Sequence, residues 1–331
     1  MVNCKNKKTL VLKLGGQCNL NCKYCHCKRV SFEFNKDIFP YIEREGFDTI
    51  VFSGGEPLLY WKYIKLTLET LGKEKTYKIV TNATLLTQEI VEYFNKYNVH
   101  VGISYDGDNK SRDFKYLPKF FLAKGLKNKS LVTLFSNDNC DNIDLLQYQT
   151  QRIKEKYSFS KETSYWFNFV HQTKLANNNK VTRELAKKYC QTLARELELD
   201  FIKFFRRKYN ISDCGVLILT FNKWIRKSKD RGVKCCRESV IPMTIDGKFL
   251  LCPYDEQYVG DIYTGIDWNK VESYIPDRCK GCQLWESCMN TCIANITENE
   301  CYISKVIYKH FYKLMDKYGV DYNFMENMIK R

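Results

Sequence analysis

Apolar and polar residues follow a repeating pattern along the first half of the chain. From residue 9 to about 170, six short runs rich in β-branched and aromatic residues are separated by longer stretches with helical periodicity. The predicted strands are Thr9–Leu14, Asp48–Phe52, Tyr77–Thr81, His100–Tyr105, Ser130–Phe135 and Ser164–Val170. The predicted helices between them are Asp37–Glu45, Leu58–Leu71, Thr87–Tyr97, Arg112–Gly125 and Asp141–Tyr157. Repeated strand–helix units predict an α/β fold, a partial (β/α)6 TIM-type barrel that is open on one side.

The second half of the chain has a different texture. Helical sequence runs from Thr182 to about Lys208 and again from Leu217 to Lys229, and the segments after it are short and rich in cysteine. A last amphipathic stretch, Ser304–Tyr318, is expected to pack back on the barrel. We therefore expect four parts: a barrel over residues 1–210, a helical linker over 211–232, a small cysteine-rich domain over 233–305 and a C-terminal helix over 306–331.

Composition narrows the class of protein. The 331 residues are 44% hydrophobic and 15% aromatic, which is typical of a globular protein. No apolar run reaches the roughly 18–20 residues that cross a bilayer, and the basic N-terminus lacks a signal-peptide core, so we expect a cytoplasmic protein with no membrane partner. In that reducing compartment, 16 cysteines indicate metal or redox chemistry rather than disulfides.

The formal charge of +15 has two possible origins. One is a basic face for nucleic acid or another acidic partner. The other is a solvated surface, which we favour because the lysines are dispersed and form no block of five or six. We expect no nucleic-acid partner, although a zinc-binding nucleic-acid protein is the alternative from a different functional class.

A cysteine run follows the first predicted strand. It reads Cys18-Asn-Leu-Asn-Cys22-Lys-Tyr-Cys25, or C-x3-C-x-Y-C. Three thiolates fit three corners of a [4Fe–4S] cluster and leave its fourth iron open, as a site for chemistry requires. Tetrahedral zinc would need a fourth close ligand, and Cys27 is too near to Cys25 for ordinary zinc spacing. The run resembles the signature of the radical S-adenosylmethionine (SAM) superfamily.

That resemblance implies a reaction and a set of site residues. In the superfamily, SAM chelates the open iron and is cleaved by an electron to a 5′-deoxyadenosyl radical, which abstracts a hydrogen from the substrate. Three further segments resemble the motifs GGEP, T-N-G-T (with alanine for glycine) and S-x-D-G; here they are Gly54–Pro57, Thr81–Thr84 and Ser104–Gly107. Strand-end capping is the alternative for the last two. By resemblance, the cofactor-binding residues are Tyr24, Gly54, Gly55, Glu56, Pro57, Asn82 and Ser104, and the catalytic ones are Cys18, Cys22, Cys25 and Asp106. We add Asp255 to the catalytic residues as a candidate acid–base group.

A second set of cysteines occupies the C-terminal third. It reads Cys236-x10-Gly247-x4-Cys252, then Cys279-x2-Cys282-x5-Cys288-x3-Cys292, then Cys301, and Asp246-Gly247 predicts a hairpin turn. The pattern resembles the SPASM extension of radical SAM enzymes, with two auxiliary [4Fe–4S] clusters. The resemblance assigns Cys236, Cys252 and Cys292 to the first cluster and Cys279, Cys282, Cys288 and Cys301 to the second. Cys235 or Cys214 could complete the first cluster, and we favour Cys235 because it lies in the same segment as Cys236. Its last position could also stay open, and zinc is the alternative metal.

Enzymes with both parts mostly act on peptides or proteins. We expect a radical SAM enzyme that modifies a peptide, with an electron donor such as flavodoxin or ferredoxin. Only 17 residues precede Cys18, so we expect any leader to be bound by a separate protein or by another surface. The alternatives are a small-molecule substrate and sulfatase maturation; the sulfatase branch places an aspartate where this chain has Pro253. Candidates for returning a hydrogen atom are Cys140, Cys190, Cys214 and Cys235, for which burial as a small hydrophobic residue is the alternative. Candidate acid–base groups are Asp255, Glu256 and His171, and His171 could equally be a core histidine.

Overall fold

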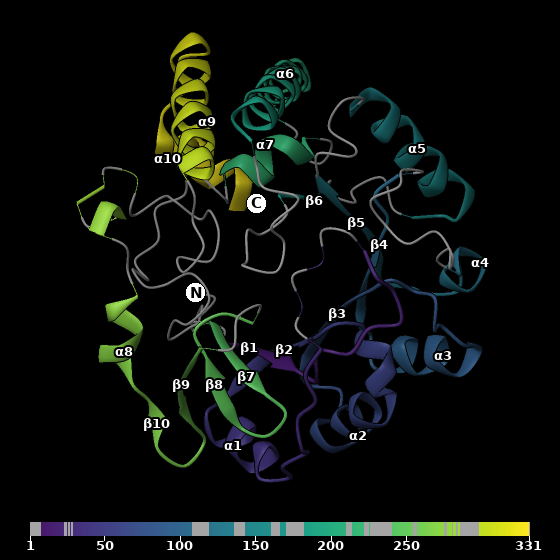
Figure 1. Ribbon diagram of the computed structural model, residues 1–331. Helices are drawn as coiled ribbons and strands as arrows, with labels where there is room; N and C mark the ends of the chain where they lie inside the picture. Colours follow the sequence, from purple (N-terminus) through teal and green to yellow (C-terminus); the bar gives the residue numbers. More distant parts are fainter. Residues whose placement is uncertain are drawn as a thin grey trace.

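A computed structural model provides the structure of this chain (Figure 1). It describes residues 8–22, 25, 27, 29–107, 119–135, 143–159, 166–169, 182–209, 214–221, 225, 240–253, 257–274, 277–279, 281–282, 284 and 298–330. Nine of the predicted site or candidate residues lie outside these ranges: Tyr24, Cys140, His171, Cys235, Cys236, Asp255, Glu256, Cys288 and Cys292.

The predicted strands are confirmed, and they pair side by side in parallel. They are β1 (Lys8–Lys13), β2 (Phe47–Ser53), β3 (Thr76–Thr81), β4 (His100–Ser104), β5 (Lys129–Phe135) and β6 (Trp166–Phe169). Helices cover the outer side of this curved sheet (Figure 1). The partial-barrel prediction is therefore confirmed, and the carboxyl ends of the strands meet at one rim.

The helices largely follow the predicted pattern. They are α1 (Ile38–Arg44), α2 (Trp61–Leu71), α3 (Gln88–Lys96), α4 (Phe120–Ala123) and α5 (Ile143–Lys156). The helix expected over Leu58–Leu71 begins instead as a short 3-10 helix, η1 (Pro57–Tyr60), because Pro57 starts it under a cap from Glu56. Only four residues of the expected Arg112–Gly125 helix are helical in the described part of that segment.

Four further strands extend the same sheet beyond β1. They are β7 (Val240–Thr244), β8 (Lys248–Leu250), β9 (Tyr258–Asp261) and β10 (Gly265–Ile266), and the sheet order is β10-β9-β8-β7-β1-β2-β3-β4-β5-β6. β7 pairs in parallel with β1, and β8 returns antiparallel to β7. The predicted hairpin turn is confirmed, since Gly247 has a φ of +88°. The pairing of this segment with the first strand of the barrel was not predicted.

Four of the remaining helices build a second hydrophobic core. The remaining helices are α6 (Arg183–Arg206), α7 (Gly215–Thr220), α8 (Trp268–Ser273), η4 (Asp277–Cys279), α9 (Glu298–Lys317) and α10 (Tyr322–Lys330). The Thr182 side chain caps α6 by accepting from the Leu185 N–H, which explains where that helix begins. Buried residues of α6, α7, α9 and α10 form one cluster, with Phe201 and Phe311 in edge contact at 5.4 Å. Where the sequence predicted one C-terminal helix over 306–331, the structure has two: α9, which already begins at Glu298, and α10.

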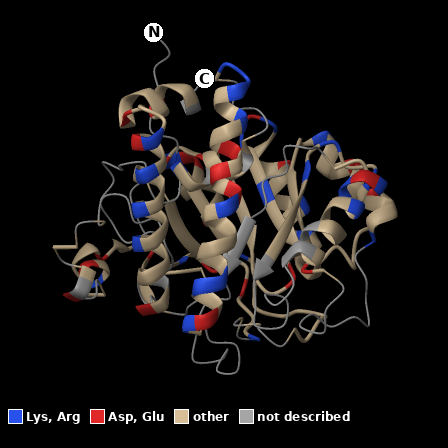
Figure 2. Ribbon diagram, turned by 90° about the horizontal axis from the view of Figure 1, so that it is seen from above, with Lys and Arg blue, Asp and Glu red and all other residues tan. Residues whose placement is uncertain are grey.

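Charged residues are spread over the helices and loops (Figure 2). This distribution fits the solvated-surface interpretation of the positive charge. Within the described residues, no helix has the length and the apolar character needed to cross a membrane. The four-part division of the chain stays a prediction.

Candidate active site

The loops that follow β1 and β2 are joined backbone to backbone. The Gly55 N–H donates to the Gly15 carbonyl at 3.1 Å, and the Glu56 N–H donates to the Gln17 carbonyl at 2.9 Å. A Cβ on Gly54 would lie 2.3 Å from the Gly15 oxygen, and one on Gly55 would lie 2.4 Å from the Gln17 oxygen. A side chain at either glycine would collide with the backbone of the loop after β1, so the contact between the two loops is enough to require both glycines.

Arg29, which follows the cysteine loop in the sequence, hydrogen-bonds back to the backbone of that loop. Its guanidinium donates to the Cys18 carbonyl and, at 2.6 Å, to the Leu20 carbonyl. The Gln17 side chain donates in turn to the Arg29 carbonyl at 3.1 Å. A planar guanidinium suits two carbonyl groups at once, so Arg29 fixes the path of the loop around Cys18.

The three thiols of the loop form an electrostatically coupled set. Cys18, Cys22 and Cys25 are all partly exposed, and the Cys25 N–H donates to the Cys22 carbonyl at 3.0 Å. Burial raises the pKa of the Cys18 thiol, and the negative charges of Glu56, Cys25 and Cys22 act in the same direction. A cation is therefore needed to hold these groups as thiolates together, which fits an iron–sulfur cluster.

Cys27 takes a different place from the other three thiols. Its thiol lies 3.4 Å from the Gly54 carbonyl, to which it donates. A hydrogen bond with Cys25 and burial both raise the pKa of Cys27, so it is a protonated neighbour of the set. Among the described residues, no three His, Cys, Asp or Glu side chains are grouped tightly enough for one metal ion. A [4Fe–4S] cluster does not need that, because its thiolates bind different irons.

Glu56 is a buried carboxylate at the start of η1, only 1% exposed. Its Oε1 accepts from the Leu58 N–H at 3.0 Å and from the Thr81 hydroxyl at 2.6 Å. Its Oε2 accepts from the Asn82 N–H at 2.8 Å. The sequence assigned Glu56 to the SAM ammonium; in the structure its carboxylate also ties the end of β2 to the end of β3.

Asn82 connects the loop after β3 with the cysteine loop. Its amide donates to Asn19 Oδ1 at 2.9 Å and lies 4.0 Å from Cys18 Sγ. The Asn19 amide donates to Thr84 Oγ1 at 2.8 Å, which closes the network. Ala83 has a φ of +57°, the left-handed conformation that the family's glycine would adopt without strain. Asn82 is thereby positioned beside the first cysteine, where the sequence expected a cofactor contact.

The ends of β4 and β1 supply further polar groups. Asp106 is buried, at 1% exposed, and Ser104 is partly exposed at the end of β4. Lys13 was missed by the sequence reasoning; it ends β1 on the face opposite to Leu12 and is 2% exposed. Its ammonium lies 5.9 Å from the centre of the Phe32 ring, and its positive charge offsets only a small part of the rise in the pKa of Cys27 that the Cys25 hydrogen bond and burial cause. A lysine in an otherwise apolar strand was the sequence feature that could have revealed it.

Four of the expected auxiliary-cluster ligands are described. Cys252 is buried just after β8, Cys279 ends η4, Cys282 follows it in a turn and Cys301 lies in the first turn of α9. Cys214, the alternative ligand, is buried in the second core with its thiol 3.5 Å from the Asp200 carbonyl. Cys190 is in the same core, where burial raises the pKa of its thiol to about 12. Such surroundings are ordinary for structural cysteines.

Comparison with known proteins gives one family match and several relatives. A model of the radical SAM superfamily matches residues 12–121. The radical SAM cyclopropyl synthase TigE of Paramaledivibacter caminithermalis is 23% identical over 355 residues, which cover 87% of this chain and 68% of that protein. The next curated relatives match over shorter stretches, 39% and 24% of their own length.

Solved structures share the fold over nearly the whole chain. Native anSMEcpe with bound AdoMet and Cp18Cys peptide is 16% identical, with a TM-score of 0.67 over 97% of this chain and 99% of that one. Streptococcus suis SuiB bound to its precursor peptide SuiA is 17% identical, with a TM-score of 0.56 over 86% of this chain and 72% of that one. At these identities the likeness establishes the fold.

Proposed function

We propose that this chain, which belongs to the radical SAM superfamily, modifies a peptide substrate by hydrogen abstraction. Its membership implies SAM and a [4Fe–4S] cluster as cofactors. The observation that carries the site is the network at the barrel rim, in which Asn82 links Cys18 to the loop after β3. The peptide substrate is supported by two structures of the same fold that contain peptides.

Each part of the rim has a task in this proposal. Cys18, Cys22 and Cys25 would hold the cluster, which, with SAM, supplies the 5′-deoxyadenosyl radical. The Glu56 carboxylate holds the Asn82 backbone by accepting from its N–H, and this hydrogen bond orients the Asn82 amide toward the cysteine loop. Ser104 and Asp106, at the end of β4, border the space in which SAM and the substrate would meet.

The C-terminal cysteines would hold two auxiliary [4Fe–4S] clusters. Cys252, Cys279, Cys282 and Cys301 would supply described ligands, and the segments that contain Cys235, Cys236, Cys288 and Cys292 would supply the others. We retain Cys235 rather than Cys214 for the first auxiliary cluster, because the Cys214 thiol is already engaged inside the helical core. Flavodoxin or ferredoxin would deliver electrons in the cytoplasm, and a separate protein would present any leader.

Metal analysis of the anaerobically reconstituted protein tests this assignment. We expect about twelve irons and as many sulfides per chain, falling to about eight when Cys18, Cys22 and Cys25 are changed to alanine together. Zinc without sulfide would contradict the radical SAM assignment of the cysteines. With the clusters in place, SAM should be cleaved to 5′-deoxyadenosine only under reducing conditions.

The substrate class is tested by mass spectrometry. Peptides encoded beside this chain, incubated with the enzyme, SAM and reductant, should change in mass. Sulfatase maturation would instead give a formylglycine aldehyde on a cysteine or serine peptide, which a hydrazide probe detects. We rank that outcome lower because Pro253 occupies the position where the sulfatase branch has an aspartate. Turnover of small molecules alone would overturn the peptide assignment.

A further inference from the structure

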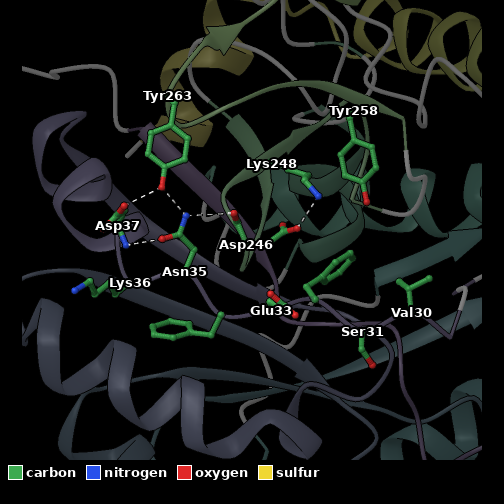
Figure 3. A pocket seen from close by; sticks show the side chains of 12 residues that line it. Val30, Ser31, Glu33, Asn35, Lys36, Asp37, Asp246, Lys248, Tyr258 and Tyr263 are labelled. Carbon is green, nitrogen blue, oxygen red and sulfur yellow. Dashed lines mark hydrogen bonds and ion pairs between the residues drawn. The ribbon is translucent and has the colours of Figure 1, made fainter.

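A groove of about 1010 Å³ opens beside the cysteine loop (Figure 3). One wall is the segment Val30–Asp37, which follows the cysteine loop along the chain. The other wall consists of Asp246 in the β7–β8 turn, Tyr258 at the start of β9 and Tyr263 just after β9. These two walls are more than 200 residues apart in sequence, and the pairing of β7 with β1 brings them together.

The wall segment Ser31–Phe34 has the character of a strand without a neighbour. Ser31 and Glu33 are exposed whereas Phe32 and Phe34 are half-buried, which is the alternation of an extended chain. The backbone bonds on either side of it are made: the Val30 carbonyl accepts from the Gly16 N–H, and the Asn35 N–H donates to Ile245. Within the described part of the chain, the backbone N–H and C=O groups of 31–34 form no hydrogen bond. Such an edge can accept an added strand.

The groove contains three carboxylates, and two of them already interact with neighbouring side chains. Asp246 pairs with Lys248 at 3.1 Å, and Asp37 accepts from the Tyr263 hydroxyl at 2.8 Å. Glu33 is exposed and has no ion pair or hydrogen bond among the described residues. Lys36, the other cation of the groove, points to its margin, whereas Glu33 lies near its centre (Figure 3). The centre of the groove is therefore locally acidic on a chain of net charge +15.

The groove leads to the candidate active site. The Val30 carbonyl, at the end of the groove wall, accepts from the Gly16 N–H at 2.6 Å, and Gly16 lies two residues before Cys18. The centre of the Phe32 ring, which also lines the groove, lies 5.9 Å from the ammonium of Lys13 at the end of β1. Val30, at one end of the wall, is only five residues beyond Cys25. A peptide that lies along 31–34 therefore has one end at the cysteine loop.

We propose that this groove binds the segment of the peptide substrate next to the modified residue, as a strand added along Ser31–Phe34. A lysine or arginine side chain of that peptide pairs with Glu33, and apolar side chains on the other face of the strand contact Phe32 and Phe34. That the bound molecule is a peptide substrate rests on the proposed function. Binding of a peptide in the groove does not require SAM cleavage, so it can be measured without catalysis.

The probe is the synthetic peptide acetyl-(Lys-Val)3-amide with a fluorescent label, added to the cluster-loaded protein without reductant. Its counterparts are acetyl-(Glu-Val)3-amide and a (Lys-Val)3 peptide with N-methylated valines. We expect the basic peptide to bind and to slow hydrogen exchange at the amides of 31–34. The acidic peptide and the N-methylated peptide should bind at least fivefold more weakly, since one lacks the charge and the other the backbone donors.

Glu33→Lys reverses the exposed charge and should weaken binding of the basic peptide roughly five- to tenfold. Glu74→Lys, an exposed position in the turn before β3, makes the same change of charge outside the groove and should leave binding unchanged. Equal weakening by both variants, or unchanged exchange at 31–34, would overturn the proposal. Binding in the groove without any change in peptide mass would leave this proposal standing and would instead count against the proposed function.

Discussion

Glu56→Gln is the most informative single change, because the carboxylate accepts three hydrogen bonds in a buried place. The variant keeps the shape but replaces one oxygen with an NH2 group, so the backbone N–H of either Leu58 or Asn82 faces a donor. An unsatisfied buried donor costs about 1–3 kcal/mol, and the remaining bonds lose their charge assistance. We expect a loss of about 3 kcal/mol in the free energy of unfolding.

Thermal unfolding of the metal-free protein, without SAM, measures this loss. With an unfolding entropy of about 2.1 cal/mol/K per residue over 331 residues, the expected fall in Tm is about 4 °C. Glu74→Gln, at an exposed turn, is the control and should shift Tm by less than about 1 °C. Because no SAM is present, a lost ligand contact cannot produce the effect. A Glu56→Gln variant as stable as its control would refute the bracing role of this carboxylate.

Three further changes test other parts of the structure. Arg29→Lys replaces a guanidinium that donates to two carbonyl groups by an ammonium, which cannot hold both in the same geometry. A chelator should therefore remove iron from the reconstituted variant about tenfold faster. Arg44→Lys, at an exposed position, is the control and should not change the rate of iron loss. Ala83→Gly relieves about 1 kcal/mol of left-handed strain and loses about 0.8 kcal/mol of methyl burial, so Tm should hardly move, whereas Ala83→Val should lower it clearly. Burial lowers the pKa of Lys154 to about 8, so between about pH 8 and the usual lysine pKa near 10.5 the unfolded chain binds more protons than the native protein. The native protein should therefore gain stability over that pH range relative to the Lys154→Met variant, as measured by urea unfolding. A stability difference between the two proteins that stays constant with pH would contradict the shift.

The parallel strands of the barrel were predictable because their signal is local. Each of the six strands is a short run of β-branched or aromatic residues, and some of the helices between them have a local start signal as well, as Thr87 shows for α3. The cysteine loop and the glycines after β2 were equally visible, since their spacing lies within a few residues.

Contacts between distant segments were not predictable in the same way. Glu56 was assigned to a ligand because its hydrogen-bond donors Thr81 and Asn82 lie about 25 residues further along the chain, and only the parallel pairing of β2 with β3 brings them to it. The same holds for β7: its apolar sequence predicts a strand but does not indicate that the strand will pair with β1. Lys13 was overlooked because a strand pattern marks a polar residue as outward, whereas the inner rim of an open barrel also accepts one.

The pairing of β7 with β1 has a consequence for how the protein is made. Lys13 and its partner Thr244 are 231 residues apart, so at about 5–20 residues per second a ribosome needs about 12–46 s to deliver the second after the first. During that interval β1 has a neighbour on one side only, and the cysteine loop has emerged while the wall formed by the β7–β8 turn has not. The edge of β1 that β7 later joins is therefore unpaired for that time, and it is the edge that leads into the cysteine loop.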